Sequence, residues 1–480
     1  MDQASKKVVI IGGGITGLAT AYFLQEKIKE AGLSIDCTLI EVEPRFGGKV
    51  VTERVDGFVM EGGPDSFITQ KPGALDLCNR LGLTDRLIQT NPTEKAIFIL
   101  SNGKLCPMPE GFNLMVPGRV MPFLWSPLVS PFGKARMGLD LMIPRRGGAG
   151  DESIASFVRR RLGQEAVDRF AEPILAGIYA GDAEKLSLRA TFPQFAQMER
   201  DHGSLVWAMW MRRWEAAKKL PRKSDWSLFV SLREGLSSLI DAVRSKLDRV
   251  TLLSGRKVIG VRPHPNPPNP IDGRYEISLD GEQLLADAVV ITTKTHTAAD
   301  WIDGWDAALA KRLRENEYVS TATVSLGFRK ADVRHPLNGF GVVIPRREKR
   351  KIMAMTWTST KFPGRAPEGH ILIRSFVGGA HQEGFVHLDD AALISTVREE
   401  LRTILKIDAA PVVSRVFRWI KANPQYNVGH LDWVDAVEKE TAKHPGFFLA
   451  GAAYRGVGLP DCIHQGRETA EKISRLLSSK

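Results

Sequence analysis

Residues 6–26 read KKVVIIGGGITGLATAYFLQE, an apolar run that breaks into three glycines and then resumes with a helical pattern. A β-branched run without polar alternation is typical of a parallel strand that is covered on both faces. After the glycines, apolar side chains recur on one face of a predicted helix, which Gly32 can end. A second predicted strand, CTLIE, finishes at Glu41. The segment therefore predicts a strand-helix-strand unit of an α/β fold.

The glycines between the first predicted strand and the helix have the G-x-G-x-x-G spacing, with Gly12, Gly14 and Gly17 at the three positions. The first permits a tight turn, the second lets the backbone approach a phosphate, and the third lets the helix pack closely on the strand. The helix N-terminus then offers N–H groups and the positive end of its dipole to a pyrophosphate. Glu41 lies at the distance along the chain expected of an acid that binds a ribose. We predict a dinucleotide site, with a purely structural unit as the alternative.

Two more glycine doublets follow, Gly47-Gly48 in EVEPRFGGKV and Gly62-Gly63 in DGFVMEGGPDSF. This series resembles the amine-oxidase superfamily of FAD flavoproteins, in which the doublet after the ribose acid, usually followed by Arg or Lys, lies against the cofactor phosphates. Lys49 has that position here. FAD is long and lies extended, so several backbone segments must approach it closely, and glycine permits such approach. The resemblance therefore implies FAD rather than NAD.

Towards the other end of the sequence, residues 445–466 read PGFFLAGAAYRGVGLPDCIHQG, a strand-like run followed by a glycine-rich turn and a predicted helix. Such a turn can present backbone N–H groups to an anion or to the carbonyl edge of a flavin. A plain strand-turn-helix is the alternative. Cofactor-like motifs in such distant parts of the sequence imply a discontinuous FAD-binding domain with the remainder inserted.

The composition limits the partners that the protein can have. Among 480 residues the net charge is +11, with basic clusters such as RREKRK at 346–351, which favours anionic partners. No helix-turn-helix, zinc-finger or RNP pattern accompanies these clusters, so we expect no nucleic acid. An anionic small molecule or an acidic bilayer surface explains the overall charge as well as nucleic acid does, and a solvated face is the alternative for any single cluster. The ten histidines lack metal-ligand spacing, so we expect no metal.

The location of the protein is indicated by its cysteines and its apolar segments. The four cysteines are far apart and form no CxxC pair, which fits a reducing compartment. Residues 113–144 are rich in large apolar side chains but are cut by prolines and glycines, so they cannot form one spanning helix. This segment either lines a pocket, dips into a membrane face or packs in a core. We expect a cytoplasmic protein, either soluble or peripheral on the inner face of the cell membrane.

Four motifs sharpen the resemblance: GGPDSF (62–67), EPILAGIYAGDAEKLSLRATFPQF (172–195), NPQYNVGH (423–430) and GVGLPDCIHQG (456–466). Together they resemble the protoporphyrinogen and coproporphyrinogen oxidases of haem biosynthesis, and in detail the Gram-positive branch of coproporphyrinogen III oxidases. The resemblance covers nearly the whole chain. It implies an FAD domain, a substrate domain and a helical lobe that contacts the bilayer in membrane-associated relatives.

The resemblance also implies a reaction, the six-electron oxidation of coproporphyrinogen III to coproporphyrin III in three flavin cycles, with O2 reduced to H2O2. The cofactor carries the redox step, so no catalytic triad is expected, and the protein needs only to place the substrate against the flavin. The alternatives are protoporphyrinogen IX oxidation, a flavin amine oxidase or carotenoid-type desaturase, and a non-catalytic basic protein. Docking of a haem-pathway enzyme that receives the porphyrin stays open.

The resemblance divides the chain into three parts. An α/β, Rossmann-like FAD-binding domain comprises residues 1–75, 225–300 and 445–480. A mixed-sheet substrate domain comprises 76–110, 190–224 and 301–444, and the helical lobe, which either faces a membrane or lines the pocket, comprises 111–189.

Site residues follow from the same motifs. The positions implied for non-covalent FAD are Gly12, Gly13, Gly14, Ile15, Thr16, Gly17, Glu41, Val42, Gly48, Lys49, Glu61, Gly62, Gly63, Pro64, Val258, Val457, Gly458 and Leu459. Four propionates would need basic groups around an apolar slot. The candidates for substrate contact are Lys71 and Arg374, with Ile178 and Phe376 facing the planar ring; a solvated lysine and ordinary core residues are the alternatives. His430 and His464 are interpreted as structural.

Overall fold

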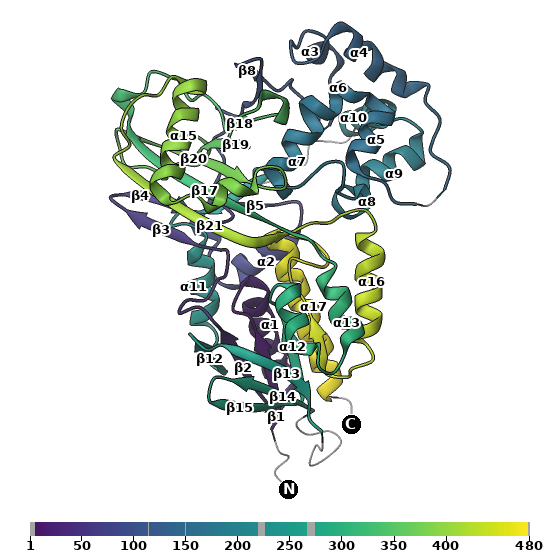
Figure 1. The fold of residues 1–480 in the computed structure, drawn as a ribbon, viewed down its shortest axis with the longest axis vertical. Coiled ribbons are helices and arrows are strands. Elements are labelled where there is room, and N and C mark those ends of the chain that lie inside the picture. The colour runs from purple at the N-terminus through teal and green to yellow at the C-terminus, as the bar shows by residue number, and fades with distance from the viewer. Residues whose placement is uncertain (1–4, 114, 149, 219–225, 266–273, 479–480) are drawn as a thin grey trace.

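The structure, a computed structural model, describes residues 5–113, 115–148, 150–218, 226–265 and 274–478. The chain forms a parallel-sheet part at the base of Figure 1, a mixed sheet above it, and a helical lobe beside the mixed sheet. The first and last described elements both belong to the parallel-sheet part. The predicted α/β class with two sheet-based parts and a helical lobe is confirmed.

Five parallel strands in the order β12-β2-β1-β16-β22 build the first sheet. The strand-helix-strand unit predicted from the sequence is present as β1 (Lys6–Ile11), α1 (Ile15–Ala31) and β2 (Ile35–Glu41). The other strands are β12 (Val250–Ser254), β16 (Ala288–Ile291) and β22 (Phe447–Leu449). Segments from early, middle and late parts of the chain therefore share one sheet.

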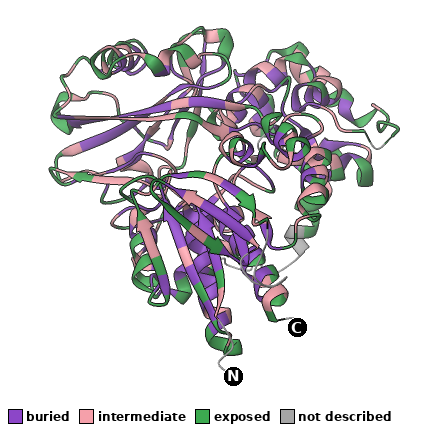
Figure 2. Cartoon of the chain, turned by 60° about the horizontal axis from the view of Figure 1, so that its bottom comes forward, coloured by how far each residue is buried: buried purple, intermediate pink, exposed green. Residues whose placement is uncertain are grey.

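Successive residues of β1 face opposite sides of this sheet. Val8 and Ile10 pack in a core with α1, α11 (Ser237–Ser245) and α17 (Leu459–Ser478). Val9 and Ile11 pack in a second core with elements of the opposite face. These elements are β13 (Val258–Pro263), β14 (Tyr275–Leu279), β15 (Glu282–Ala286), α12 (Thr295–Ile302), α13 (Ala307–Arg314) and α16 (His430–Thr441). Both faces of β1 are thus covered, and Figure 2 shows the parallel strands largely buried.

The helices α1 and α17, from distant parts of the sequence, lie side by side against the sheet (Figure 1). Gly466 permits their close approach, because a Cβ atom at this position would lie 2.8 Å from the carbonyl oxygen of Thr16. The glycine-rich segments that precede these two helices are thereby brought to the same edge of the sheet.

The second sheet has seven strands in the order β21-β17-β20-β19-β18-β7-β8, antiparallel except for the β18–β7 pair. Their bounds are β21 (Val413–Pro424), β17 (Tyr318–Arg329), β20 (His370–Gly378), β19 (Ala354–Trp357), β18 (Gly341–Val343), β7 (Ile97–Ser101) and β8 (Lys104–Pro107). Helix α15 (Asp390–Leu405) covers one face and shares its apolar core. The mixed sheet predicted for the substrate domain is therefore present.

Further short elements lie beside the two sheets. They are β3 (Thr52–Val55) paired with β4 (Phe58–Glu61), the sheet of β5 (Phe67–Ile68), β11 (Phe229–Leu232) and β6 (Leu87–Gln89), and the helices α2 (Pro72–Arg80) and α14 (Thr358–Lys361).

The lobe contains short strands and helices packed around one apolar core. Its elements are β9 (Phe112–Asn113), β10 (Val116–Pro117), α3 (Val120–Leu124), α4 (Pro131–Gly138), α5 (Ile154–Leu162), α6 (Gln164–Ala166), α7 (Glu172–Tyr179), α8 (Leu188–Thr191), α9 (Pro193–His202) and α10 (Leu205–Lys218). Phe195 and Met198 of α9 and Ala208 of α10 are buried in the same core as Phe157 of α5. The boundary expected at residue 189 differs, since α9 and α10 pack with the lobe rather than with the mixed sheet.

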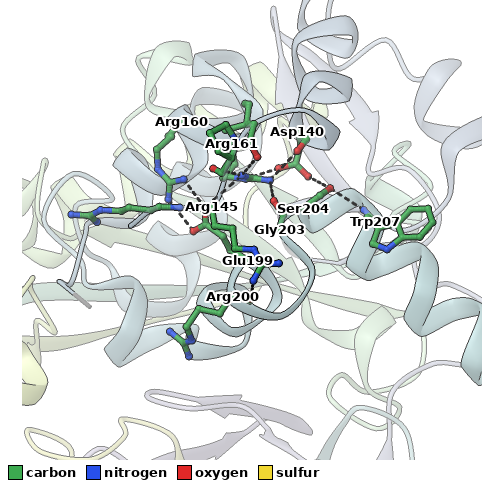
Figure 3. A network of polar contacts seen from close by, with 12 residues as sticks. Asp140, Arg145, Arg160, Arg161, Glu199, Arg200, Gly203, Ser204 and Trp207 are labelled. Carbon is green, nitrogen blue, oxygen red and sulfur yellow. Dashed lines mark hydrogen bonds and ion pairs between the residues drawn. The ribbon is translucent and has the colours of Figure 1, made fainter. Parts of the chain in front are cut away.

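A buried charge network holds the lobe together (Figure 3). Arg161 of α5 and Asp140 are fully buried, with 2.6 Å between Arg161 Nε and Asp140 Oδ1. The other carboxylate oxygen of Asp140 accepts bonds from Ser204 Oγ and from the main-chain N–H of Val206, so its charge is well compensated. Glu199 of α9 accepts from Arg160 at 2.6 Å.

Within the described residues, no helix is long and apolar enough to cross a bilayer.

Candidate functional site

The turn between β1 and α1 is tightly packed on its inner side and open at the helix start. A Cβ atom on Gly17 would lie 1.9 Å from the carbonyl oxygen of Gly12, and one on Gly13 would lie 2.4 Å from the Phe46 ring. Gly12 itself has a φ of +108°, which glycine adopts readily. At Gly14, the N-cap of α1, a Cβ would meet nothing within 4 Å. Space for an anion thus exists at the N-terminus of α1.

Glu41 lies at the end of β2, as predicted, and is buried. Its Oε2 accepts the main-chain N–H of Gly13 at 2.6 Å, and its Oε1 accepts that of Glu43 at 2.9 Å. The next residue, Val42, is 57% exposed. The loop before β13 bonds back to this point, with the N–H of Arg256 on the Glu41 carbonyl at 3.0 Å, so Val258 at the start of β13 belongs to the same edge of the sheet.

The second glycine doublet contacts the first turn. The N–H of Gly47 donates to the carbonyl oxygen of Gly13 at 2.7 Å, and a Cβ on Gly48 would lie 3.2 Å from Gly14 Cα. Both glycines of the doublet have positive φ angles. The two segments that sequence reasoning assigned to the cofactor phosphates are therefore in direct contact.

Lys49 links this doublet to the mixed sheet. Its Nζ donates to the carbonyl oxygen of Ala422 at 2.6 Å, just before the end of β21. Burial lowers the pKa of Lys49 to about 8, and the nearby ammonium of Lys294 adds to the effect. Because a buried ammonium is costly without an anionic partner, this side chain is suited to a negatively charged ligand.

The third doublet is held by three strands of the mixed sheet. The carbonyl oxygen of Gly62 accepts from Thr323 Oγ1 at 3.0 Å, from Trp419 Nε1 at 2.9 Å and from Arg374 Nη2 at 3.1 Å. A Cβ on Gly63 would lie 1.9 Å from the carbonyl oxygen of Lys49. Pro64 follows in a half-buried position. Local sequence gave no sign of these side-chain partners, which come from β17, β20 and β21.

Glu61 and Asp65, on either side of this doublet, are both engaged by protein groups. Glu61 accepts from Thr52 Oγ1 at 2.7 Å and from the N–H of Leu236 at 2.9 Å, and burial raises its pKa. Burial alone would also raise the pKa of Asp65, but Lys361 at 2.9 Å and Arg374 hold it well below its usual value. Asp65 and Lys361 were not among the predicted site residues.

The glycine-rich turn before α17 reaches the same place. Gly451 lies close to the first turn, with a Cβ there 4.0 Å from Thr16 Oγ1. The turn continues through Val457 and Gly458, which are half-buried, to the buried Leu459 that begins α17. Ile15 and Thr16 at the start of α1 are buried as well. The cofactor segments predicted from distant parts of the sequence therefore converge, and their residue types suit an anionic dinucleotide.

The candidate substrate residues lie in three places. Lys71 is half-exposed and its Nζ binds Asp461 Oδ1 at 2.7 Å, beside the turn before α17. Arg374 is only 3% exposed; its guanidinium donates to the carbonyls of Gly62 and Gly63, and its Cζ lies 4.8 Å from the Phe376 ring centroid. Ile178, on α7 of the lobe, is 50% exposed. The contacts of Arg374 are those of a residue that fixes backbone, while substrate contact by these four residues stays a prediction.

Comparison with known proteins bears on the whole chain. The profile of the flavin-containing amine oxidoreductases matches residues 15–474. A Bacillus subtilis protein named coproporphyrinogen III oxidase is 38% identical over 97% of each chain, and a chloroplastic protoporphyrinogen oxidase of Arabidopsis thaliana is 31% identical over 98% of this chain and 88% of its own. A crystal structure from Exiguobacterium sp. 255-15, provisionally described as a protoporphyrinogen oxidase, has a TM-score of 0.86 and 34% identity, covering 98% of this chain and 99% of its own. The resemblance found in the motifs is confirmed, and the chain belongs to the family of flavin-containing amine oxidoreductases.

Proposed function

We propose that the protein is a flavin-dependent oxidase that converts coproporphyrinogen III to coproporphyrin III, with O2 as electron acceptor and H2O2 as its product. The observation that carries this proposal is the end-to-end similarity to relatives named for that reaction. Family membership implies a flavin; FAD, bound without a covalent link, is the finer proposal, and the four glycine-containing segments that converge at one edge of the sheet support it.

When bound, the flavin supplies the chemistry of accepting electrons from a carbon centre. In this proposal the residues of the chain bind and orient. The open N-terminus of α1 at Gly14 takes the pyrophosphate, Glu41 accepts hydrogen bonds from a ribose, and Lys49 contributes a cation. The hydrogen bonds from the mixed sheet to the Gly62 carbonyl hold the third doublet in place, so that the backbone beside the flavin ring keeps a fixed position.

A direct assay tests the substrate. The purified, FAD-loaded protein is given coproporphyrinogen III or protoporphyrinogen IX at equal concentration, and porphyrin fluorescence and O2 uptake are followed together. We expect faster turnover of coproporphyrinogen III, with three O2 consumed for each porphyrin formed. A preference for protoporphyrinogen IX would overturn the substrate assignment, and protein that is colourless and cannot be loaded with FAD would overturn the oxidase itself.

We further propose that the lobe lies against an acidic membrane surface. Large apolar side chains are exposed on it, namely Met121, Leu124, Trp125, Phe132, Leu139, Leu141, Met142, Trp207, Trp210 and Trp214. Three of them, Trp207, Trp210 and Trp214, follow one face of α10. An open hollow of about 380 Å³ combines Leu141, Met142 and Trp207 with Arg145 and His202. Aromatic side chains beside an arginine are suited to a bilayer interface with anionic lipids.

Co-sedimentation with vesicles of phosphatidylcholine and phosphatidylglycerol tests this surface. Phe132→Glu and Met142→Glu, at positions that are 90% and 81% exposed, are expected to abolish binding while the melting temperature is unchanged. Ile259→Glu is the matched control, because Ile259 is 57% exposed on β13, away from the lobe. Equal binding by all four proteins would contradict the proposal.

A further inference from the structure

The segment QYNVGH, residues 425–430, joins β21 to α16 and contacts all three parts of the molecule. Gln425 Nε2 donates to the carbonyl oxygen of Tyr179 at the end of α7, at 3.1 Å. The carbonyl oxygen of Tyr426 accepts the N–H of Ser187 at 2.7 Å, and the N–H of Val428 donates to the carbonyl oxygen of Lys185 at 2.9 Å. The main chain of this segment is therefore attached to the lobe.

The side chain of Tyr426 reaches in the other direction, to the turn before α17. Its hydroxyl donates to the carbonyl oxygen of Ala452 at 2.8 Å and accepts the N–H of Gly456 at 2.8 Å. The residue is only 2% exposed, so water does not replace these bonds. One phenol group thus uses both its donor and its acceptor to span residues 452–456.

The turn that Tyr426 spans needs such support. Gly456 has a φ of +123°, and a Cβ there would lie 2.5 Å from Asp461 Cβ, so the backbone is in a conformation that few residues adopt. Within the described residues, one further side chain accepts a main-chain N–H of the turn: Gln465 Oε1 accepts the N–H of Gly451 at 3.3 Å. Val457, Gly458 and Leu459 follow directly, so their placement depends on that of Gly456.

The ring of Tyr426 is fixed as well. It stacks on His430, with ring centroids 3.8 Å apart and an interplanar angle of 14°. Burial lowers the pKa of His430 to about 4, so the ring is neutral, and its Nε2 carries the proton that bonds to the carbonyl oxygen of Tyr454 at 2.8 Å. Both partners of the stack therefore hold the same turn.

We propose that Tyr426 is a positioning residue for the flavin, whose hydroxyl sets the backbone of residues 452–456 and thereby the contact that Val457, Gly458 and Leu459 make with the cofactor. This inference rests on the proposed flavin site. It assigns a role to a residue that does not itself belong to the cofactor segments.

Tyr426→Phe in the full-length chain removes the hydroxyl and keeps the ring on His430. The matched control is Tyr275→Phe, because Tyr275 on β14 is 3% exposed and its hydroxyl donates one buried bond to the Pro445 carbonyl at 3.0 Å. We expect both variants to melt at lower temperature than the wild type. Only Tyr426→Phe is expected to weaken FAD binding, by about tenfold, and to shift the flavin midpoint potential.

Wild-type affinity and midpoint potential in Tyr426→Phe would overturn the inference, whereas failure of the wild type to bind FAD would overturn the proposed function instead. If Tyr426→Phe does not fold, 3-fluorotyrosine introduced at position 426 alone preserves the ring and weakens the hydroxyl as an acceptor. We then expect a several-fold loss of FAD affinity at an unchanged melting temperature, and an unchanged affinity would overturn the inference.

Discussion

The glycine turn after β1 and the glycine turn before α17 lie next to each other but are held in different ways. In the first turn, main-chain groups, Glu41 and the hydroxyl of Thr292 bond to the backbone. Gly17 packs on Gly12 with no room for a Cβ. Apart from Thr292, the groups that hold the first turn lie within residues 6–47. The second turn is held by Gln465 of α17, the helix that follows it, and by Tyr426 of the distant loop between β21 and α16.

The largest expected effect comes from Gly17→Ala, which breaks the first turn. Its Cβ would lie 1.9 Å from the Gly12 carbonyl oxygen, so α1 must move away from β1. We expect a loss of about 3 kcal/mol or more in the free energy of unfolding and no bound flavin. Chemical denaturation and the ratio of flavin absorbance to protein absorbance measure both. Gly304→Ala, where a Cβ meets nothing within 4 Å, is the control.

Gly14→Ala separates packing from binding in the same turn. Its Cβ meets nothing within 4 Å, so the flavin-free protein should lose only about 1 kcal/mol or less, as for other alanines at a helix N-cap. If the open space holds the pyrophosphate, FAD affinity falls by more than tenfold. Fluorescence titration with FAD gives the dissociation constant, and a wild-type value would show that the phosphates bind elsewhere.

A pH series on Lys49 sharpens the comparison, because this residue follows the doublet that contacts the first turn. Its pKa of about 8 in the flavin-free protein means that it is charged below pH 8 and largely neutral above it. Binding of an anionic cofactor above pH 8 then requires proton uptake, so FAD affinity should fall by up to about tenfold per pH unit. In Lys49→Arg the charge persists and the dependence should vanish. Parallel curves for both proteins would contradict this.

Lys71→Met, beside the second turn, should have the smallest effect on folding. The half-exposed pair with Asp461 contributes at most about 1 kcal/mol, so the melting temperature changes little. If Lys71 also attracts a propionate, KM for coproporphyrinogen III rises several-fold while kcat is kept. Steady-state kinetics decides this, and an unchanged KM would leave Lys71 as a structural residue.

The sequence allowed the first turn to be predicted in detail, because strand, glycine spacing and Glu41 all lie within residues 6–41. The three partners of the Gly62 carbonyl could not be predicted, since Thr323, Arg374 and Trp419 come from strands whose pairing depends on the whole fold. Substrate contact by Arg374 stays a prediction, and its bonds to the carbonyls of Gly62 and Gly63 could not be predicted, because those residues are distant in the sequence. The motif NPQYNVGH could be recognised in the sequence, but its structural role could not be predicted. The hydroxyl of Tyr426 bonds to Ala452 and Gly456, which lie in a separate turn.

The helices α9 and α10 show another limit of the sequence. An amphipathic pattern indicates that a helix has an apolar face but does not say which core receives it. Phe195 and Ala208 pack in the lobe, and nothing local distinguished this from packing on the mixed sheet.

The packing of α1 against α17 has a consequence for biosynthesis. Gly466 must pack against Thr16 before the glycine turn that precedes α17 can lie beside the glycine turn that follows β1. A ribosome adds about 5–20 residues per second, so roughly 20 to 90 s pass between synthesis of the first glycine turn and of α17. During that interval the newly made β1 and α1 lack α17, the helix that packs against α1 in the folded protein. The site that the two glycine turns form together is therefore complete only after α17 has been made and has packed against α1.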